Sequence, residues 1–223
     1  MEFTAKTLPD LPFVHVVETN ESELWLTHFC SQGVLKDRLG LIQLMSKMYQ
    51  FLFRCIRERH KLSDEQTQII LVLRDGIVAF YPALHEFPNA HVGLIGHERN
   101  TSTDPPTTMV SFRRYEDPQR FETVIVVDPM VATGETLMQV MTELATMPSK
   151  VIVACLLTTR EAALKVKDRV TAIYAFSLEK GLVNVAWITP GLRGTKDLGD
   201  VIFNTALDWK TSEDGESKCP RRS

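Results

Sequence analysis

Residues 124–137 read Val-Ile-Val-Val-Asp-Pro-Met-Val-Ala-Thr-Gly-Glu-Thr-Leu. The first four residues favour β structure and show no polar alternation, which is typical of a strand buried on both faces. The small residues Ala132, Thr133 and Gly134 then lead into an apolar-periodic helix. The stretch therefore predicts a buried strand that runs directly into the N-terminus of a helix.

The turn after this strand has the features of a phosphate-binding loop. Backbone N–H groups at a helix N-terminus, together with the helix dipole, favour an anion. Thr133 and Thr136 add hydroxyl donors, and Gly134 lets the backbone approach a ligand closely. Asp128 lies at the carboxyl end of the strand, where open parallel sheets bind ligands. Its carboxylate can accept hydrogen bonds from the hydroxyl groups of a sugar. The alternative is an ordinary strand-to-helix turn capped by Thr136.

Further strand and helix patterns alternate between Ile69 and Phe176. A second apolar run, Ile69–Leu73, ends in Arg74-Asp75-Gly76 before an apolar helical segment. The other expected strands are residues 91–96, 110–113, 151–157 and 171–176, and the other expected helices are residues 137–147 and 161–166. The alternation predicts an α/β fold with a mainly parallel sheet flanked by helices. Neither a dinucleotide fingerprint nor a P-loop sequence is present.

The segments before and after this core have different patterns. Residues 1–20 are expected to form an extended arm that reaches a neighbouring subunit. Residues 35–60 show helical spacing of apolar residues, which predicts an amphipathic helix whose basic C-terminal end is solvated. We expect residues 1–209 to form one domain with its core at 69–205, followed by a polar tail at 210–223 that is disordered.

Composition excludes several classes of protein. The chain has 223 residues, 44% hydrophobic and 24% charged, and a net charge of -3, so no basic excess points to nucleic-acid binding. Its four cysteines form no CxxC pair, which favours reduced thiols over zinc sites or disulfides. There is no apolar run of membrane-spanning length and no signal-peptide pattern at the start of the sequence. We therefore expect a cytoplasmic protein without membrane or nucleic-acid partners.

Three of these motifs carry a resemblance to a known family. Residues 124–137 resemble the ribose-phosphate loop of type I phosphoribosyltransferases, and Asp-Pro-Met followed by Ala-Thr-Gly is similar to the form found in uracil phosphoribosyltransferases. Arg74-Asp75-Gly76 matches the position of that family's Arg-Ala-Gly loop, and residues 96–100 resemble its Gly-x-x-Arg-Asn signature. Pro129 argues against the purine and orotate branches, which favour paired acids. Two departures are Asp75 in place of alanine and Glu135 in place of glycine.

The resemblance implies that the loops bind 5-phosphoribosyl 1-diphosphate (PRPP), with magnesium carried by this substrate and residues 101–108 forming a mobile loop. The catalytic residues would be Asp128, Arg74 and Arg99. The residues implied in binding PRPP and its phosphates are Arg74, Arg99, Asp128, Pro129, Met130, Val131, Ala132, Thr133, Gly134, Glu135, Thr136 and Asp197.

A glycine-rich stretch, residues 187–205, resembles the family's uracil-binding signature, although its loop is longer than usual. Whether Gly194 or Lys196 takes the third position of that signature is left open by the sequence. The residues implied in binding uracil are Ile188, Lys196, Asp197 and Leu198.

The expected activity is that of a glycosyltransferase of pyrimidine salvage, which converts uracil and PRPP to uridine 5′-monophosphate (UMP) and pyrophosphate. A homodimer or higher homo-oligomer is expected. The alternative is a catalytically inert or regulatory nucleotide-binding paralogue, because Asp75, Glu135 and the lengthened loop at residues 193–196 all fall inside binding elements.

Overall fold

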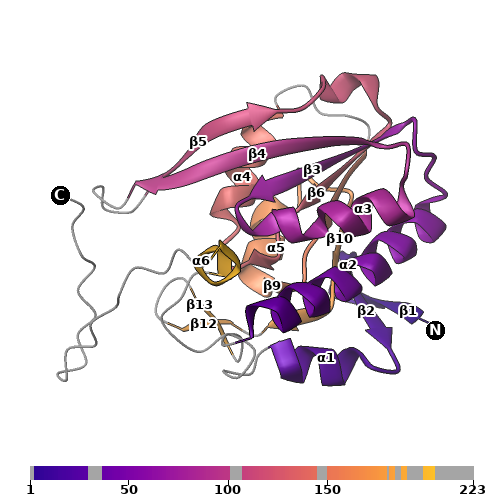
Figure 1. Cartoon of the computed structure of the whole chain (residues 1–223), viewed down its shortest axis with the longest axis vertical. Coiled ribbons are helices and arrows are strands. Elements are labelled where there is room, and N and C mark those ends of the chain that lie inside the picture. Colours follow the sequence, from indigo (N-terminus) through magenta and orange to yellow (C-terminus); the bar gives the residue numbers. More distant parts are fainter. Residues whose placement is uncertain are drawn as a thin grey trace.

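A central sheet of eight strands organises the computed structural model (Figure 1), which describes residues 3–29, 37–100, 107–144, 150–179, 181–183, 187–189 and 198–203. The strand order is β1-β2-β10-β8-β6-β3-β4-β5. The six inner strands are parallel, and β1 and β5 are antiparallel at the two edges. These strands are β1 (Phe3–Leu8), β2 (Leu11–Thr19), β3 (Thr67–Leu73), β4 (His91–Asn100), β5 (Thr107–Arg114), β6 (Thr123–Val127), β8 (Lys150–Ala154) and β10 (Ala172–Ala175).

Helices cover both faces of the sheet. One face packs against α1 (Ser22–Phe29), α2 (Arg38–His60), α3 (Phe80–Glu86) and α6 (Leu198–Phe203), and the other against α4 (Glu135–Glu143) and α5 (Arg160–Val166). Successive residues of the central strands β3, β6, β8 and β10 alternate between these two hydrophobic clusters. Ile125 lies in the first cluster and Val126 in the second, and both are fully buried. The predicted fold class is thus confirmed, and its physical basis is the unbroken apolar run expected of a doubly covered strand.

The N-terminal segment, expected to be an extended arm on a neighbouring subunit, is a hairpin on the edge of its own sheet. Strand β2 pairs in parallel with β10, so that His15 lies opposite Tyr174, and β1 closes the edge. Val14 and Val17 of β2 are fully buried, one in each cluster. Burial of these apolar side chains against the chain's own helices gives the segment a place in the core.

The amphipathic helix expected at residues 35–60 is α2, and its described part begins at Arg38. Asp37 caps it by accepting a hydrogen bond from the Gly40 N–H at 2.9 Å. The helix ends at Lys61, which has a positive φ of 52°. Nine of its side chains are buried, which agrees with the expected amphipathic pattern.

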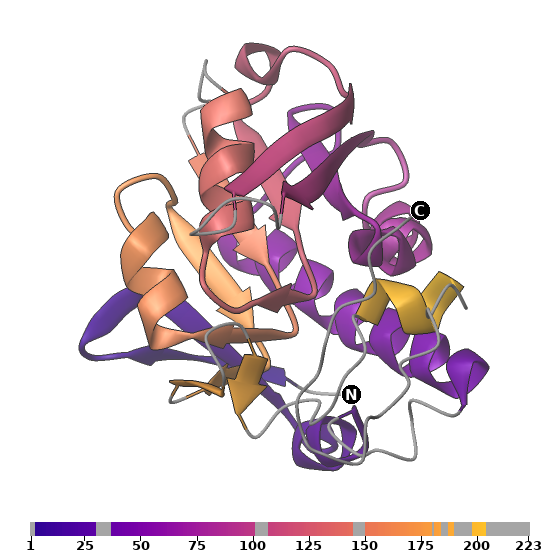
Figure 2. The ribbon, with the colours of Figure 1, turned by 90° about the vertical axis from the view of Figure 1, so that its left-hand side faces the viewer.

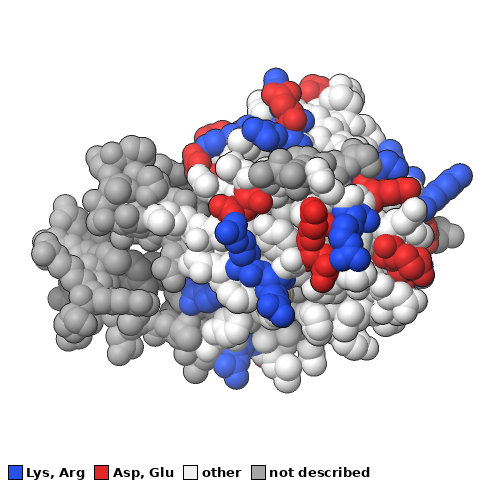
Figure 3. All heavy atoms as spheres, turned by 90° about the horizontal axis from the view of Figure 1, so that it is seen from above, with Lys and Arg blue, Asp and Glu red and all other residues white. Residues whose placement is uncertain are grey.

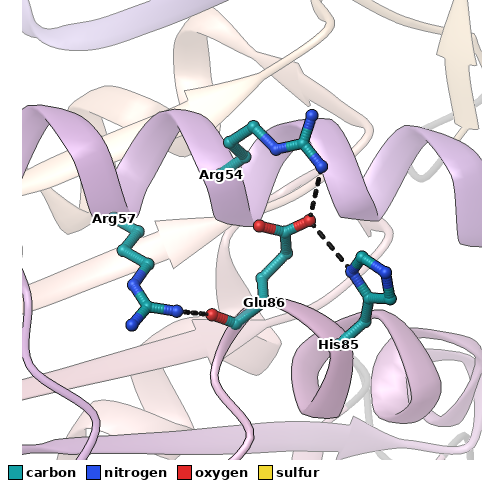
Figure 4. Close-up of polar contacts among 4 residues, drawn as sticks. All are labelled: Arg54, Arg57, His85 and Glu86. Atoms are coloured by element: carbon teal, nitrogen blue, oxygen red, sulfur yellow. Dashed lines mark hydrogen bonds and ion pairs between the residues drawn. The ribbon is translucent and has the colours of Figure 1, made fainter.

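Near the end of α2, Arg59 and Lys61 are exposed, as expected from the sequence, whereas Arg54 and Arg57 are half-buried and contact Glu86 (Figure 4). Arg54 forms an ion pair with Glu86 at 2.9 Å, and Arg57 donates to the backbone carbonyl of Glu86. His85 also contacts the Glu86 carboxylate, at 3.1 Å. Arg57 pairs in addition with the buried Asp64 at 2.9 Å. These contacts tie the end of α3 to α2.

Several element boundaries differ from the predictions. The strand expected at residues 91–96 continues to Asn100 and forms a long hairpin with β5, and the expected strand at 151–157 is divided into β8 and β9. A small second sheet contains β7 (Met130–Val131), β9 (Leu157–Thr159) and β11 (Ser177–Glu179). The remaining elements are η2 (Asp75–Ala79), η3 (Pro118–Arg120), β12 (Gly181–Val183) and β13 (Trp187–Thr189). No helix in the described ranges is both long enough and apolar enough to span a membrane.

Candidate active site

The carboxyl ends of β3 and β6 lie side by side at the centre of the sheet. Leu71 of β3 is paired with Val127, the last residue of β6. From this point the chain leaves β3 toward α3 on one face and leaves β6 toward α4 on the other, as Figure 2 shows. In open α/β sheets, ligands usually bind at such a reversal, in the crevice outside the carboxyl ends of the strands.

The loop after β3 forms one wall of this crevice. It contains Arg74, which is exposed, and Asp75, which is half-buried. The Leu73–Arg74 peptide bond is cis. Gly76 packs against the end of β6, since a Cβ atom there would lie 2.9 Å from the Val127 carbonyl oxygen. Only glycine fits so close to the neighbouring backbone, and its fit brings the β3 loop directly against the start of the β6 loop.

Asp128 begins the opposite wall, one residue beyond β6. Its N–H donates to the Ala154 carbonyl at 3.3 Å, and its Oδ1 accepts from the Met130 N–H at 3.4 Å. The side chain is half-buried. These contacts hold the carboxylate at the edge of the sheet beside the β3 loop.

Tyr49 of α2 lies in the core close to both walls. It is fully buried, and its hydroxyl has no hydrogen-bond partner among the described residues. Burial first, and then the nearby Cys155 and the carboxylates of Asp128 and Asp75, hold the pKa of Tyr49 well above its usual value. Burial and Asp128 likewise raise the pKa of the fully buried Cys155 thiol. Tyr49 was not singled out by the sequence.

The predicted phosphate loop connects Asp128 to α4. Gly134 adopts a φ of +75°, which side chains other than glycine rarely tolerate, and its carbonyl accepts the first helical hydrogen bond from Met138 at 2.9 Å. The Glu135 N–H faces the Thr133 hydroxyl at 3.4 Å. Ala132, Thr133 and Thr136 are half-buried. The loop thus delivers the N-terminus of a helix of nine residues to the crevice.

Two threonines that the sequence did not single out hold this loop from behind. Thr158 donates to the Val131 carbonyl at 3.3 Å, and Thr159 donates to the Ala132 carbonyl at 2.7 Å. Thr159 also accepts from the Ala162 N–H at 3.0 Å and so caps α5. Both threonines are fully buried. Because the hydroxyls bind the loop carbonyls from the β9–α5 side, the loop is fixed to α5 as well as to α4.

Glu135, the residue that departs from the family pattern, points to α5. Its carboxylate forms an ion pair with Lys165. Across the loop, the Nε2 atom of His97 lies 3.4 Å from the Thr136 hydroxyl, which brings β4 to the first turn of α4. Neither Lys165 nor His97 was predicted as a site residue.

The other predicted site residues are only partly described. The backbone of Arg99 lies in β4 opposite Thr108, on the hairpin beside the crevice. Ile188 pairs with Leu182 in the β12–β13 hairpin. Leu198 begins α6, and its side chain is buried in the cluster that contains α2. Lys196 and Asp197, together with residues 101–106 of the mobile loop expected at 101–108, lie outside the described residues.

The surface charges form no single-signed field on the face seen in Figure 3, where acidic and basic side chains are interspersed. Within the described ranges, no group of three or more His, Cys, Asp or Glu side chains is placed to hold a metal ion.

A family model of uracil phosphoribosyltransferase matches residues 43–205, a span that contains both walls of the crevice. This chain belongs to the uracil phosphoribosyltransferase family. Among curated relatives, the uracil phosphoribosyltransferase of Thermococcus sibiricus is 30% identical over 145 residues, and that of Dictyoglomus turgidum is 33% identical over 147 residues.

These matches cover 62% and 65% of this chain, and 60% and 69% of the Thermococcus and Dictyoglomus proteins. Among solved structures, the AQ2163 protein of Aquifex aeolicus has a TM-score of 0.76 at 20% identity and aligns over 87% of this chain and 99% of its own. The structural likeness shows a shared fold only, and the match to the family model shows the family.

Proposed function

We propose that this member of the family transfers the phosphoribosyl group of PRPP to uracil and releases UMP and pyrophosphate. The observation that carries the proposal is the meeting of two loops at one switch point, inside the span that matches the family. One loop presents Arg74, and the other presents Asp128 followed by a helix N-terminus. Together they offer places for a pyrophosphate, a ribose and a phosphate in the order in which PRPP carries them.

Each part of PRPP has chemically suitable partners in this arrangement. The 5′-phosphate would bind the N–H groups and hydroxyls of residues 132–136, where the dipole of α4 favours an anion. The Asp128 carboxylate would accept hydrogen bonds from the ribose hydroxyls. The pyrophosphate would bind Arg74 and Arg99, whose forked guanidinium groups suit phosphate oxygens. Magnesium would enter as part of the PRPP substrate, in keeping with its preference for phosphate and water oxygens.

In this reaction the main contribution of the protein would be to position the two substrates. The C1′–O bond of PRPP breaks and its electron pair leaves with pyrophosphate, while uracil N1 forms the new bond to C1′ and loses its proton. Positive charge develops on the ribose and negative charge on the leaving group. Arg74 would stabilise the leaving group, and the two loops would hold C1′ between the leaving oxygen and the base.

Uracil recognition is proposed for the stretch that includes Ile188 and residues 196–198. Uracil presents two carbonyl acceptors and one N3–H donor, so a site that reads it needs two donors and one acceptor. Cytosine has an acceptor at N3, and an unpaired buried acceptor costs about 1 to 3 kcal/mol. A cost of about 1.4 kcal/mol, within this range, corresponds to about tenfold selectivity for uracil, which is the expected result.

A second candidate is a nucleotide-binding regulator of the same fold. One observation favours it: Asp75, in place of the family's alanine, puts a half-buried carboxyl group in the loop proposed to hold pyrophosphate. A carboxylate near a polyanion weakens its binding. Such a protein would retain the UMP site at Asp128 and residues 132–136.

A turnover assay with magnesium PRPP separates the two candidates. Uracil, cytosine and hypoxanthine would each be supplied, and the nucleotide and pyrophosphate products would be measured. Calorimetry with UMP would run in parallel. Formation of UMP from uracil alone supports the transferase. UMP binding without turnover of any base selects the regulator, and turnover with hypoxanthine only refutes the assigned base.

We also propose that the protein acts in the cytoplasm, in pyrimidine salvage, as a homodimer or higher homo-oligomer. The support for self-association is the apolar surface of α3, where Phe80 is 43% exposed and Tyr81 is 66% exposed. Sedimentation velocity of the full chain measures its oligomeric state directly. A monomer at micromolar concentration would contradict this part of the proposal.

A further inference from the structure

The wall of the phosphate loop contains an ion pair between two helices. Glu135 is the first residue of α4, and its carboxylate meets the ammonium group of Lys165, near the end of α5. The aliphatic stem of Lys165 runs beside the loop, because a Cβ atom at Gly134 would lie 3.5 Å from its Cδ. Lys165 therefore reaches its partner along the outer side of the phosphate loop.

The position of Glu135 creates an electrostatic conflict with a bound phosphate. The first turn of a helix attracts negative charge, so the Glu135 carboxylate and a phosphate dianion favour the same region. Two like charges a few ångströms apart repel each other unless one of them is neutralised. Lys165 supplies the neutralising charge and also draws the carboxylate toward α5.

We propose that Lys165 is a positioning residue for phosphate binding, acting through Glu135. It turns the Glu135 carboxylate away from the bound phosphate and cancels its charge, so that the N–H groups and hydroxyls of residues 132–136 serve the ligand alone. The proposal rests on the proposed phosphate site and not on the identity of the base.

The effect of this ion pair on ligand affinity can be measured separately from its effect on folding, because both side chains are partly exposed. The Lys165 side chain is 36% exposed and that of Glu135 52% exposed. Ion pairs at this level of exposure contribute little to stability. Replacing Lys165 should thus change phosphate affinity while leaving thermal unfolding almost unchanged, which is a result that a merely structural contact would not give.

The experiment measures ribose 5-phosphate and UMP binding by calorimetry for the full-length parent and for Lys165→Met, Glu135→Gln and the double variant. Lys165→Met should weaken both ligands about fivefold, the order expected for one unpaired charge acting across a partly solvated loop. Glu135→Gln should bind at least as tightly as the parent. The double variant should return to within about twofold of the parent, because the repelling charge has been removed. Lys167→Met removes an exposed lysine from the end of the same helix and should have no effect.

Three results would overturn the proposal. Unchanged affinity in Lys165→Met would show that Glu135 never competes with the phosphate. An equal loss of affinity in Lys165→Met and in the double variant would show that Lys165 acts on the ligand directly. Absence of ribose 5-phosphate binding to the parent would remove the phosphate site itself. A parent that binds ribose 5-phosphate but does not turn over uracil refutes the proposed function and leaves this test in force.

Discussion

Replacing Thr159 by valine should loosen the phosphate loop, because its hydroxyl joins the loop to α5. The hydroxyl donates to the Ala132 carbonyl at 2.7 Å and accepts from the Ala162 N–H at 3.0 Å, and the side chain is fully buried. Valine keeps the shape but removes both bonds. Loss of a helix N-cap costs about 1 kcal/mol, and an unsatisfied buried carbonyl costs about 1 to 3 kcal/mol. We therefore expect Thr159→Val to lower the free energy of unfolding by about 3 kcal/mol.

Urea unfolding of the parent and Thr159→Val measures this loss of stability. Thr158→Val is the matched control. The Thr158 hydroxyl donates to the Val131 carbonyl at 3.3 Å but caps no helix, so its replacement should cost about 1 kcal/mol less than that of Thr159. Thr159→Ser keeps the hydroxyl and should recover most of the stability. The melting temperature of Thr159→Val should fall by about 6 to 12 °C for a chain of this size.

The same variant should bind UMP more weakly at a temperature where it is fully folded, since the carbonyl that fixes the loop has lost its donor. A loss below about 1 kcal/mol, or equal losses for Thr158→Val and Thr159→Val, would refute the assigned anchoring role. Normal UMP affinity in a clearly destabilised Thr159→Val would confine the contact to folding.

Three other predictions concern Asp128, Arg74 and His15. Asp128→Asn should leave the melting temperature unchanged but remove most PRPP turnover, and equal activity would exclude Asp128 from the site. Arg74→Lys should weaken PRPP binding about tenfold with little effect on UMP, which lacks pyrophosphate, and equal weakening of both would contradict the role. Burial, then Arg59 and His60, lower the pKa of His15 from 6.5 to about 4. The unfolded chain then binds the extra proton, so stability is full above pH 6.5 and falls by about 2 kcal/mol toward pH 4, and urea unfolding of His15→Gln should lack this fall.

The parallel core could be predicted from the sequence because its strands are covered on both faces. The runs at Ile69–Leu73 and Val124–Val127 contain no polar residue, and each is followed by a loop with a charged side chain. Adjacent parallel strands bring such loops together, so the joint site of Arg74 and Asp128 followed from the order of the motifs. The observed pairing of β3 with β6 confirms that these two loops are neighbours.

The supports of the site could not be predicted, because they depend on contacts between distant residues. Thr159 is 27 residues from the carbonyl that it holds, and Lys165 is 30 residues from Glu135. An exposed lysine is common on helices, so nothing in the sequence marks Lys165 as a residue that supports the site. The N-terminal hairpin was missed for a related reason: whether an extended segment joins its own sheet depends on an open sheet edge, here that of β10.

The two loops of the candidate site are supported mainly by different layers of helices, one on each face of the central sheet. The loop with Arg74 continues into α3, which is anchored to α2 through Glu86, whereas the loop with Gly134 rests on α4 and α5. The separation is not complete, because Met130 and Ala132 of the phosphate loop also pack against the cluster that contains α2. Damage to the layer of α4 and α5 should thus affect mainly the phosphate end of the ligand. Pyrophosphate and UMP become separate probes of the two layers, and substitutions can alter the grip on one end of PRPP while leaving the grip on the other intact.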